Sequence, residues 1–353
     1  MMRHKIKFIH PSYQGNKGFS LTEMLVSMTV GMLVFAGVIG LLVASNETVS
    51  DTVQRGEMQE NGRLALTLVS QDIMLAGYYG QFTGMDIHEA SSADTEIVKL
   101  NQVNGNKVAV EGTDCVGDGE NNGTFFVENS DFFFRHIWST HTESSSIFNC
   151  ISSAISNTDV LQIKRVLGDE ISAGEELDTR YYLISTDNQA VFYAGSDATP
   201  VVNNGVISEY QHHIYYIENE SRGSVSVPIL KRKYLYKTEN STGNQAKLKA
   251  QTLVEGIERM GFLFGIDSDS DGTVNYYAKA EELTREHWEN DGSEILAIKA
   301  YILVRALEPD NKITNTKVYD MGSYLYTVND NYRRMLFINT VKIINAGKEV
   351  WRS

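Results

Sequence analysis

The stretch "FSLTEMLVSMTVGMLVFAGVIGLLVASN", residues 19–46, decides the architecture of the chain. Its last 23 residues, from Met24 onward, carry no charge. A helix needs roughly 20 predominantly apolar residues to cross the hydrocarbon core of a bilayer, so this run predicts a transmembrane helix. A carboxylate, Glu23, stands directly before the run, and Gly18 lies five residues before that carboxylate.

Basic residues before the apolar run set its expected orientation. Arg3, Lys5, Lys7 and Lys17 precede it, and no acidic residue accompanies them. Because lysine and arginine flanks stay in the cytoplasm, the N-terminus is predicted to be cytoplasmic and the rest of the chain to be exported. A cleaved secretory signal has a shorter apolar region, about 7–15 residues long. The sequence therefore predicts a membrane-anchored protein with a large external domain.

The composition is that of a folded protein whose exported part is acidic. Of the 353 residues, 42% are hydrophobic and 22% are charged, as in ordinary globular domains. The net charge is −14, and without the four basic residues of positions 1–18 the remaining 27 basic and 45 acidic residues give −18. Such a surface would be repelled by phosphate backbones, so no nucleic-acid partner is expected.

Helical periodicity continues beyond the membrane segment, and no proline occurs between Pro11 and Pro200. Large apolar residues recur at helical spacings among polar ones: Val49, Val53, Leu64, Leu68 and Leu75. The pattern predicts a helix that reaches about Gly77 and is roughly 90 Å long. Residues 19–45 form its transmembrane half and residues 46–80 its amphipathic half, with the three leucines as the expected packing stripe.

After Gly80 the chain changes to short β-type segments and polar loops, which predict a β-rich head over residues 81–353. Seven segments are expected strands: 160–166, 181–185, 191–193, 212–217, 229–236, 295–304 and 336–344. Residues at about 84–158 contain glycine- and asparagine-rich runs such as "VGDGENNGT" and are expected to form an insertion in the head.

Two cysteines, Cys115 and Cys150, lie in this insertion. In an exported domain they are expected to form one disulfide, which closes a loop of about 35 residues and contributes roughly 3–4 kcal/mol in the chain-entropy picture. A metal site would need two more soft ligands. His136 and His141 lie between the cysteines, but they do not give a recognisable zinc spacing.

An acidic loop resembles the first half of an EF-hand, because its residues follow the D-x-D-x-D-G spacing that converges oxygens on a hard cation. The residues that would bind Ca²⁺ are Asp267, Asp269, Asp271, Thr273 through its carbonyl, and Asn275. The twelfth position is Ala278 instead of glutamate, so Glu281 or Glu282 would have to substitute. The alternative is an acidic turn that holds no ion.

No pattern of catalytic residues is present. The sequence contains no HExxH, GxSxG or P-loop motif. His212 and His213 are adjacent in an expected strand and would point to opposite faces, which does not suit a shared metal. The sequence therefore predicts neither an enzyme nor a required cofactor.

The segment Gly18-Phe19-Ser20-Leu21-Thr22-Glu23 resembles the processing site of type IV pilins and type II secretion pseudopilins. The resemblance implies that prepilin peptidase cuts after Gly18, which makes residues 1–18 a leader, and that Phe19 becomes N-methylated. It also implies that Glu23 pairs with the new amine of Phe19 during assembly. An unpaired carboxylate in hydrocarbon costs several kcal/mol, which favours such a partner. The alternative places Glu23 among lipid headgroups without one.

Four further segments resemble PilW-type minor pilins, which are related to the J-type pseudopilin: "ENGRLALTLVSQDIMLAGYYG" (60–80), "FLFGIDSDSDGTVNYY" (262–277), "AIKAYILVRA" (297–306) and "YRRMLFINTVKIINA" (332–346). The resemblance implies an α+β, type IV pilin-like fold. In that fold a long N-terminal helix, transmembrane in its first half, packs on an antiparallel β-rich head.

The resemblance also implies a function and a location. A PilW-type minor pilin helps to initiate type IV pilus assembly within a tip-located minor-pilin complex. Its expected partners are other minor pilins, the major pilin, prepilin peptidase, the inner-membrane assembly platform and membrane lipid. The head is expected in the periplasm and then on the cell-surface pilus. Two alternatives stay open: a J-type pseudopilin of a type II secretion system, which gene neighbourhood would reveal, and a tip adhesin that uses the insertion.

Overall fold

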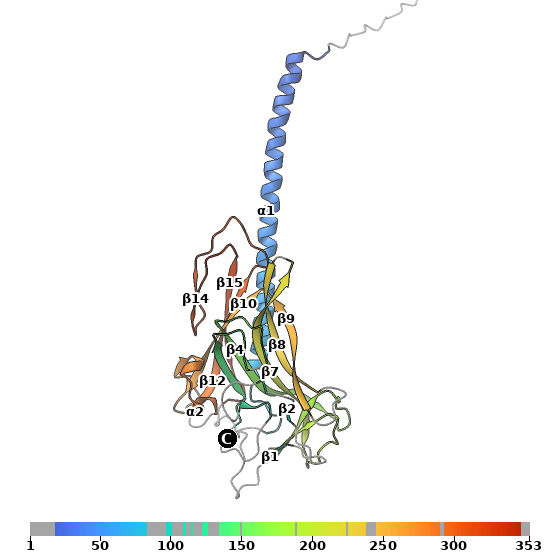
Figure 1. Cartoon of the computed structure of the whole chain (residues 1–353), viewed down its shortest axis with the longest axis vertical. Coiled ribbons are helices and arrows are strands. Elements are labelled where there is room, and N and C mark those ends of the chain that lie inside the picture. Colours follow the sequence, from blue (N-terminus) through green and yellow to red (C-terminus); the bar gives the residue numbers. More distant parts are fainter. Residues whose placement is uncertain are drawn as a thin grey trace, which may run out of the picture. The chain divides into compact units, whose positions relative to one another are not determined.

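The computed structural model describes residues 18–82, 97–100, 109–110, 114–115, 122–125, 134–148, 150–187, 189–223, 225–237, 245–289 and 293–346. The chain divides between Val53 and Gln54 into two compact units. The first unit contains the N-terminal part of helix α1 (Leu21–Met74), and the second contains the rest of α1 and the head (Figure 1).

Helix α1 is 54 residues long and contains no proline, as the periodicity predicts. It ends at Met74, three residues before the expected position. The chain then turns at Gly77, whose φ of +71° lies in the left-handed region that glycine adopts without a steric penalty. The first unit leaves the large apolar side chains of α1 exposed, and the second buries one stripe of the helix.

The predicted packing stripe of α1 is correct only in part, because Leu68 packs against the main core whereas Leu64 does not. Leu64 is 46% exposed, and Leu68 and Leu75 are only half-buried. The fully buried stripe consists of other residues, of which only Met58 and Ile73 are as large as leucine: Met58, Gly62, Ala65, Val69, Asp72 and Ile73. At Gly62 a Cβ atom would overlap the ring of Phe337, so the helix approaches the sheet more closely than a leucine face would allow.

The larger sheet has nine strands. They are β1 (Ile97–Leu100), β2 (Ala109–Val110), β3 (Ile137–Thr142), β4 (Thr158–Ile171), β5 (Tyr181–Ser185), β6 (Gln189–Ala194), β7 (Val206–Arg222), β8 (Val225–Lys237) and β9 (Gln245–Glu255). The main order is β1-β6-β5-β7-β8-β9-β2, while β4 pairs with β7 and β3. All these pairs are antiparallel except β1–β6 and β2–β9.

A second, four-stranded antiparallel sheet has the order β11-β10-β12-β15. Its strands are β10 (Ile257–Asp267), β11 (Tyr276–Ala278), β12 (Glu294–Arg305) and β15 (Arg334–Lys342). The remaining elements are the hairpin of β13 (Val318–Asp320) and β14 (Leu325–Thr327), the 3₁₀-helix η3 (Ala280–Glu282) and the short helix α2 (Arg285–Trp288). A long N-terminal helix packed on a mostly antiparallel head confirms the expected α+β fold class.

Each of the seven expected strands overlaps an observed strand, and the longest described strands without a counterpart among them are β9 and β10. β10 carries Gly261 and Gly265, and glycine inside a strand weakens the sequence signal. Gly261 lies where a Cβ atom would overlap the carbonyl oxygen of Met321, so the β13–β14 hairpin can pack directly on the strand.

The largest apolar core joins the second part of α1 to strands of both sheets. Ile73 of the helix belongs to the same buried cluster as Tyr215 of β7, Phe262 of β10 and Ile302 of β12. Fully burying a side chain of this size contributes about 1.5–3 kcal/mol, so this cluster fixes the helix to the head.

The expected insertion at 84–158 is described only in pieces, and the rest of it lies outside the described residues. Its described strands belong to the larger sheet: β1 pairs with β6, β2 with β9, and β3 with β4.

Candidate functional site

The predicted processing junction lies at the start of α1, and the leader residues 1–17 lie outside the described residues. Phe19 is 87% exposed. The backbone N–H of Ser20 donates a hydrogen bond to Oε2 of Glu23 at 2.9 Å, and the backbone N–H of Thr22 donates to Oγ of Ser20 at 3.2 Å. Ser20 and Glu23 thus both cap the start of the helix in an S-x-x-E sequence, with the Ser20 hydroxyl bonded to the N–H of Thr22 instead of that of Glu23.

Glu23 therefore has a partner before any cleavage takes place. The four residues Ser-Leu-Thr-Glu carry this capping signal, which neither of the two expected settings of Glu23 included. Its carboxylate stabilises the helix start in the uncleaved chain, where unpaired N–H groups and the helix dipole favour negative charge.

The helix that follows has the length and composition of a membrane span, and its most apolar window is unburied. Phe19, Leu21, Met32, Leu33 and Leu41 are each more than 70% exposed. In the first unit this surface must be covered by lipid or by other apolar helices, because exposing it to water is unfavourable.

In the second unit, α1 is fixed to the larger sheet by a buried carboxylate that the sequence analysis missed. Asp72 is only 3% exposed. Nε and Nη2 of Arg165 in β4 lie 2.9 and 2.6 Å from its Oδ1. Its Oδ2 lies 2.5 Å from Nδ1 of His213 and accepts a hydrogen bond from the hydroxyl of Tyr215, both in β7.

Burial alone would raise the pKa of Asp72, but the charges and hydrogen bonds of His213, Arg165 and Tyr215 outweigh it and hold the pKa well below its usual range. The guanidinium of Arg165 is permanently charged, so it favours the ionised form of Asp72 and lowers its pKa. One sequence signal was present: Asp72 falls in phase with the buried positions Val69 and Ile73.

The two adjacent histidines of β7 do serve opposite faces of the sheet. Nδ1 of His213 meets Asp72, whereas Nδ1 of His212 lies 3.0 Å from Oγ1 of Thr124. They do not converge on a shared site.

An apolar groove lies between α1 and β15, the last strand of the smaller sheet. It is a hollow of about 470 Å³. Its lining comes from both elements and from the second residue after the end of β15: Leu66, Thr67, Ser70, Gln71, Met74, residues 339–342 and Ile344. Ile344 beside it and Ile338 in β15 are half exposed, at 50% and 49%. The groove offers uncovered apolar surface beside a strand that, among the described residues, pairs only with β12.

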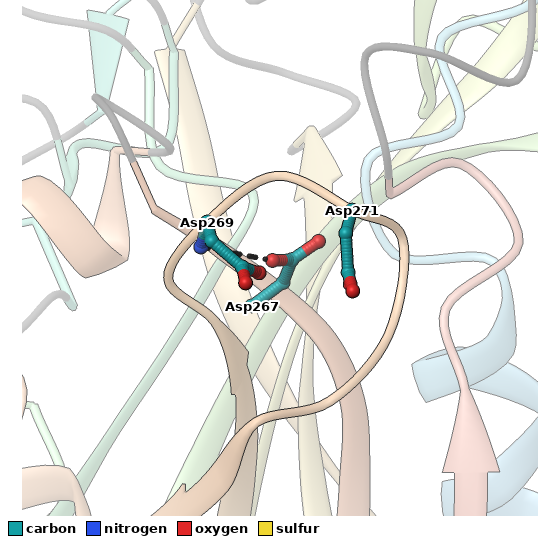
Figure 2. A group of neighbouring side chains, drawn as sticks. All are labelled: Asp267, Asp269 and Asp271. Atoms are coloured by element: carbon teal, nitrogen blue, oxygen red, sulfur yellow. Dashed lines mark hydrogen bonds between the residues drawn. The ribbon is translucent and has the colours of Figure 1, made fainter.

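The acidic loop predicted to bind Ca²⁺ connects β10 to β11. Ligand atoms of Asp267, Asp269 and Asp271 lie within 4.8 Å of one another, and Figure 2 shows the three carboxylates gathered in the loop. Asp267 is buried, while the other two are exposed. Such oxygen donors are the type that Ca²⁺ prefers.

Several of the oxygen atoms that would bind the ion already accept hydrogen bonds from within the loop. The backbone N–H groups of Asp269 and Ser270 donate to Oδ1 of Asp267, and that of Gly272 donates to Oδ2. The N–H of Thr273 donates to Asp271, and Oδ1 of Asn275 accepts from the N–H and hydroxyl of Ser268. Ala278 at the twelfth position lies in β11. The calcium site stays a prediction, and Asp269 is its freest predicted ligand.

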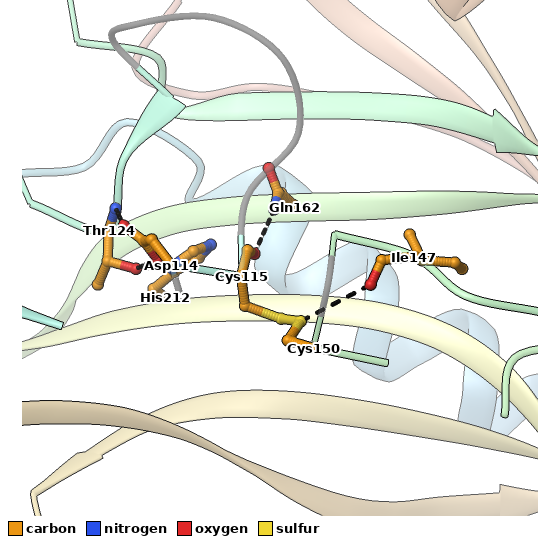
Figure 3. Close-up of a disulfide and its surroundings, with 7 residues drawn as sticks. All are labelled: Asp114, Cys115, Thr124, Ile147, Cys150, Gln162 and His212. Atoms are coloured by element: carbon orange, nitrogen blue, oxygen red, sulfur yellow. Dashed lines mark hydrogen bonds between the residues drawn. A yellow bond between two sulfur atoms is a disulfide. The ribbon is translucent and has the colours of Figure 1, made fainter. Parts of the chain in front are cut away.

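The expected disulfide is present. Cys115 and Cys150 are bonded, with their Cα atoms 5.5 Å apart. Figure 3 shows it beside polar contacts that hold the same segment to β4 and β7. Nε2 of Gln162 donates to the carbonyl oxygen of Cys115 at 2.9 Å, and Asp114 accepts from the N–H and hydroxyl of Thr124 at 2.7 and 2.6 Å.

Two family models match the chain. Residues 14–39 match the prokaryotic N-terminal methylation motif, which includes the Gly18–Phe19 junction and Glu23. Residues 214–345 match the family described as type IV pilus-assembly protein W, from within β7 to just beyond β15. These two matches support a type IV pilus minor pilin of the PilW type. Neither the search of curated proteins nor the search of solved structures finds a match to the chain.

The two matches cover different parts of the chain. The methylation motif and the apolar helix support anchoring in the membrane and association with a pilus. The PilW match contains the smaller sheet, the strand side of the groove and the acidic loop. Proteins of this family are structural pilins, which implies contact with other pilins and with the assembly machinery.

Proposed function

We propose that this PilW-type pilin helps to initiate type IV pilus assembly as part of a minor-pilin complex at the pilus tip. The observation that carries the proposal is the combination of an exposed apolar helix, which begins at a processing-type junction, with a head unit of Gln54–Ser353. A head of this size suits an end position, because repeated packing along a shaft would require every neighbour to accommodate it.

Processing creates the assembly-competent form in this proposal. Prepilin peptidase cuts after Gly18, Phe19 is N-methylated, and Glu23 exchanges its capping hydrogen bond to Ser20 for the new amine of Phe19 or of a neighbouring subunit. The exchange is favourable in an apolar surrounding because an ion pair neutralises a carboxylate that hydrocarbon would otherwise penalise.

The apolar groove between α1 and β15 is the proposed contact for another minor pilin. Its lining combines apolar side chains with uncharged polar ones, and Lys342 is its one charged residue among those described. A neighbouring subunit that covered this surface would gain from burying it, whereas the open hollow leaves apolar area in water.

The proposal is tested by labelling the chain in purified pili and identifying the subunits that co-purify. We expect label at pilus ends and co-purification with other minor pilins. Label at regular intervals along the shaft would contradict the tip position. Normal piliation together with a secretion defect in the deletion strain would point to a pseudopilin instead.

A further inference from the structure

A buried lysine lies in the middle of β4 without a carboxylate partner among the described residues. Lys164 is 1% exposed. Its Nζ donates to the backbone carbonyl and to the side-chain Oδ1 of Asn122, at 2.9 and 3.2 Å, and to the carbonyl of Arg135 at 2.9 Å. It also lies 4.5 Å from the ring centroid of Phe134. Its direct contacts are therefore neutral carbonyl groups and an aromatic ring.

A charged ammonium is costly in such a place, because burial without an opposite charge removes hydration that is not replaced. Burial lowers the pKa of Lys164 to about 7; the charge of Asp114 opposes the shift and that of Arg135 adds to it. The lowered pKa makes the neutral amine, which is the nucleophilic form, easier to reach near neutral pH than for an exposed lysine.

The group that faces this amine is a carboxamide held in one orientation. Asn122 is fully buried. Its Nδ2 donates to Oε1 of Gln162 at 2.8 Å, which turns Oδ1 toward Lys164. The carboxamide carbon is one C=O bond, about 1.2 Å, from that oxygen. An amine and an acyl carbon are therefore held together in a dry site, where proximity replaces a bimolecular encounter.

We propose that Lys164 and Asn122 form an intramolecular amide bond in the folded protein. The lone pair of Nζ attacks Cγ of Asn122, a Cγ–Nζ bond forms and the Cγ–Nδ2 bond breaks. One Nζ proton goes to Nδ2, which leaves as ammonia. No oxidant, reductant or other reactant takes part. The charge of Asp114, which already acts on Lys164, stabilises the positive charge that develops on Nζ during attack.

The amide bond would be a second covalent tie in the region that carries the disulfide. Cys115–Cys150 closes one loop, and Asn122–Lys164 would attach the same segment to β4 at another point. The inference rests on these contacts alone and is independent of the proposed role in pilus initiation.

Mass spectrometry of the full chain, purified in detergent and reduced, tests the proposal. We expect an intact mass lower by one ammonia than that of the processed sequence, and a tryptic digest in which the peptide with Asn122 is joined to the peptide with Lys164. Lys164→Arg keeps a cation and its hydrogen-bond donors but has no nucleophilic amine, so it should retain the full mass. If the variant fails to fold, the linked peptides in the wild-type digest still test the proposal by themselves.

Two results would overturn the proposal. A wild-type chain with its full mass, cleaved after Lys164 into unlinked peptides, would mean that Lys164 is an ammonium that only binds the three carbonyl oxygens. Loss of ammonia at Asn122 with the Lys164 peptide unlinked would mean that the backbone nitrogen of the following Gly123 has closed a succinimide ring.

Discussion

Asp72 of α1 and Arg165 of β4 form a buried ion pair in which two guanidinium nitrogens, at 2.6 and 2.9 Å, contact one carboxylate oxygen. The two residues are 93 positions apart in the chain. The pair fixes both the depth and the rotation of the helix on the larger sheet, since the donors on Arg165 reach only one face of α1.

Replacing Asp72 should destabilise the head strongly. Asp72→Asn leaves Arg165 buried without a counter-charge, and breaking a buried pair in this way costs about 3–5 kcal/mol. The free energy of unfolding of the detergent-solubilised chain measures the loss. Glu60→Gln on the exposed side of the same helix is the matched control, with an expected change near zero. Equal effects of the two substitutions would contradict the role of the pair.

The two tasks assigned to Glu23 can be separated by substitution. Glu23→Gln keeps an oxygen that can accept the N–H of Ser20 but removes the charge that would pair with an amine. We expect processing to persist and pilus number to fall sharply. Ser20→Ala removes its side of the cap but keeps the Glu23 charge, so it should assemble nearly normally. Normal piliation in Glu23→Gln would limit this residue to helix capping.

The His141–Asp159 contact predicts a pH-dependent contribution to stability. Nδ1 of His141 lies 2.7 Å from Oδ1 of Asp159, and this hydrogen bond raises the pKa of His141 above 6.5 although burial opposes it. A raised pKa means that the contribution is complete below pH 6.5 and is lost as the pH rises through the folded value. The difference in unfolding free energy between wild type and His141→Gln should therefore shrink with rising pH. A pH-independent difference would count against the ion pair.

Calcium binding at the β10–β11 loop can be measured directly by calorimetric titration of the purified chain. We expect one site whose heat disappears in the double variant Asp269→Asn and Asp271→Asn, because these exposed carboxylates supply charge to the ion. Asp267 is left unchanged, since it holds the loop through three backbone N–H groups. No heat in the wild type would establish the loop as an acidic turn without an ion.

The groove between α1 and β15 should determine which subunits bind the head. Ile344→Asp places a charge at its half-exposed edge and should lower the yield of co-purified minor pilins several-fold, because the charge would be desolvated on binding. Leu177→Asp is the matched control, as Leu177 is a 59% exposed aliphatic residue in a loop away from the groove. Equal yields from the two variants would place the contact elsewhere.

Local sequence patterns predicted where the helix and most long strands lie better than they predicted which residues pack against each other. The apolar run and the unbroken helical period predicted α1, and branched and aromatic clusters placed seven strands. The packing face of α1 was predicted only in part because large leucines were taken as the buried stripe, whereas the sheet accepts small residues such as Gly62 and Ala65. Strand β10 was missed because its interior glycines, which make room for neighbours, resemble turn signals.

The sequence by itself determined the membrane helix, the processing-type junction at Gly18–Phe19 and the presence of one cysteine pair, because each depends on local composition or on a short motif. Only the tertiary structure decided that Asp72 lies against Arg165 and His213, and that the amine of Lys164 faces the carboxamide of Asn122. Periodicity reports which side of an element is buried. The partner that a buried polar group meets there depends on how distant segments are brought together.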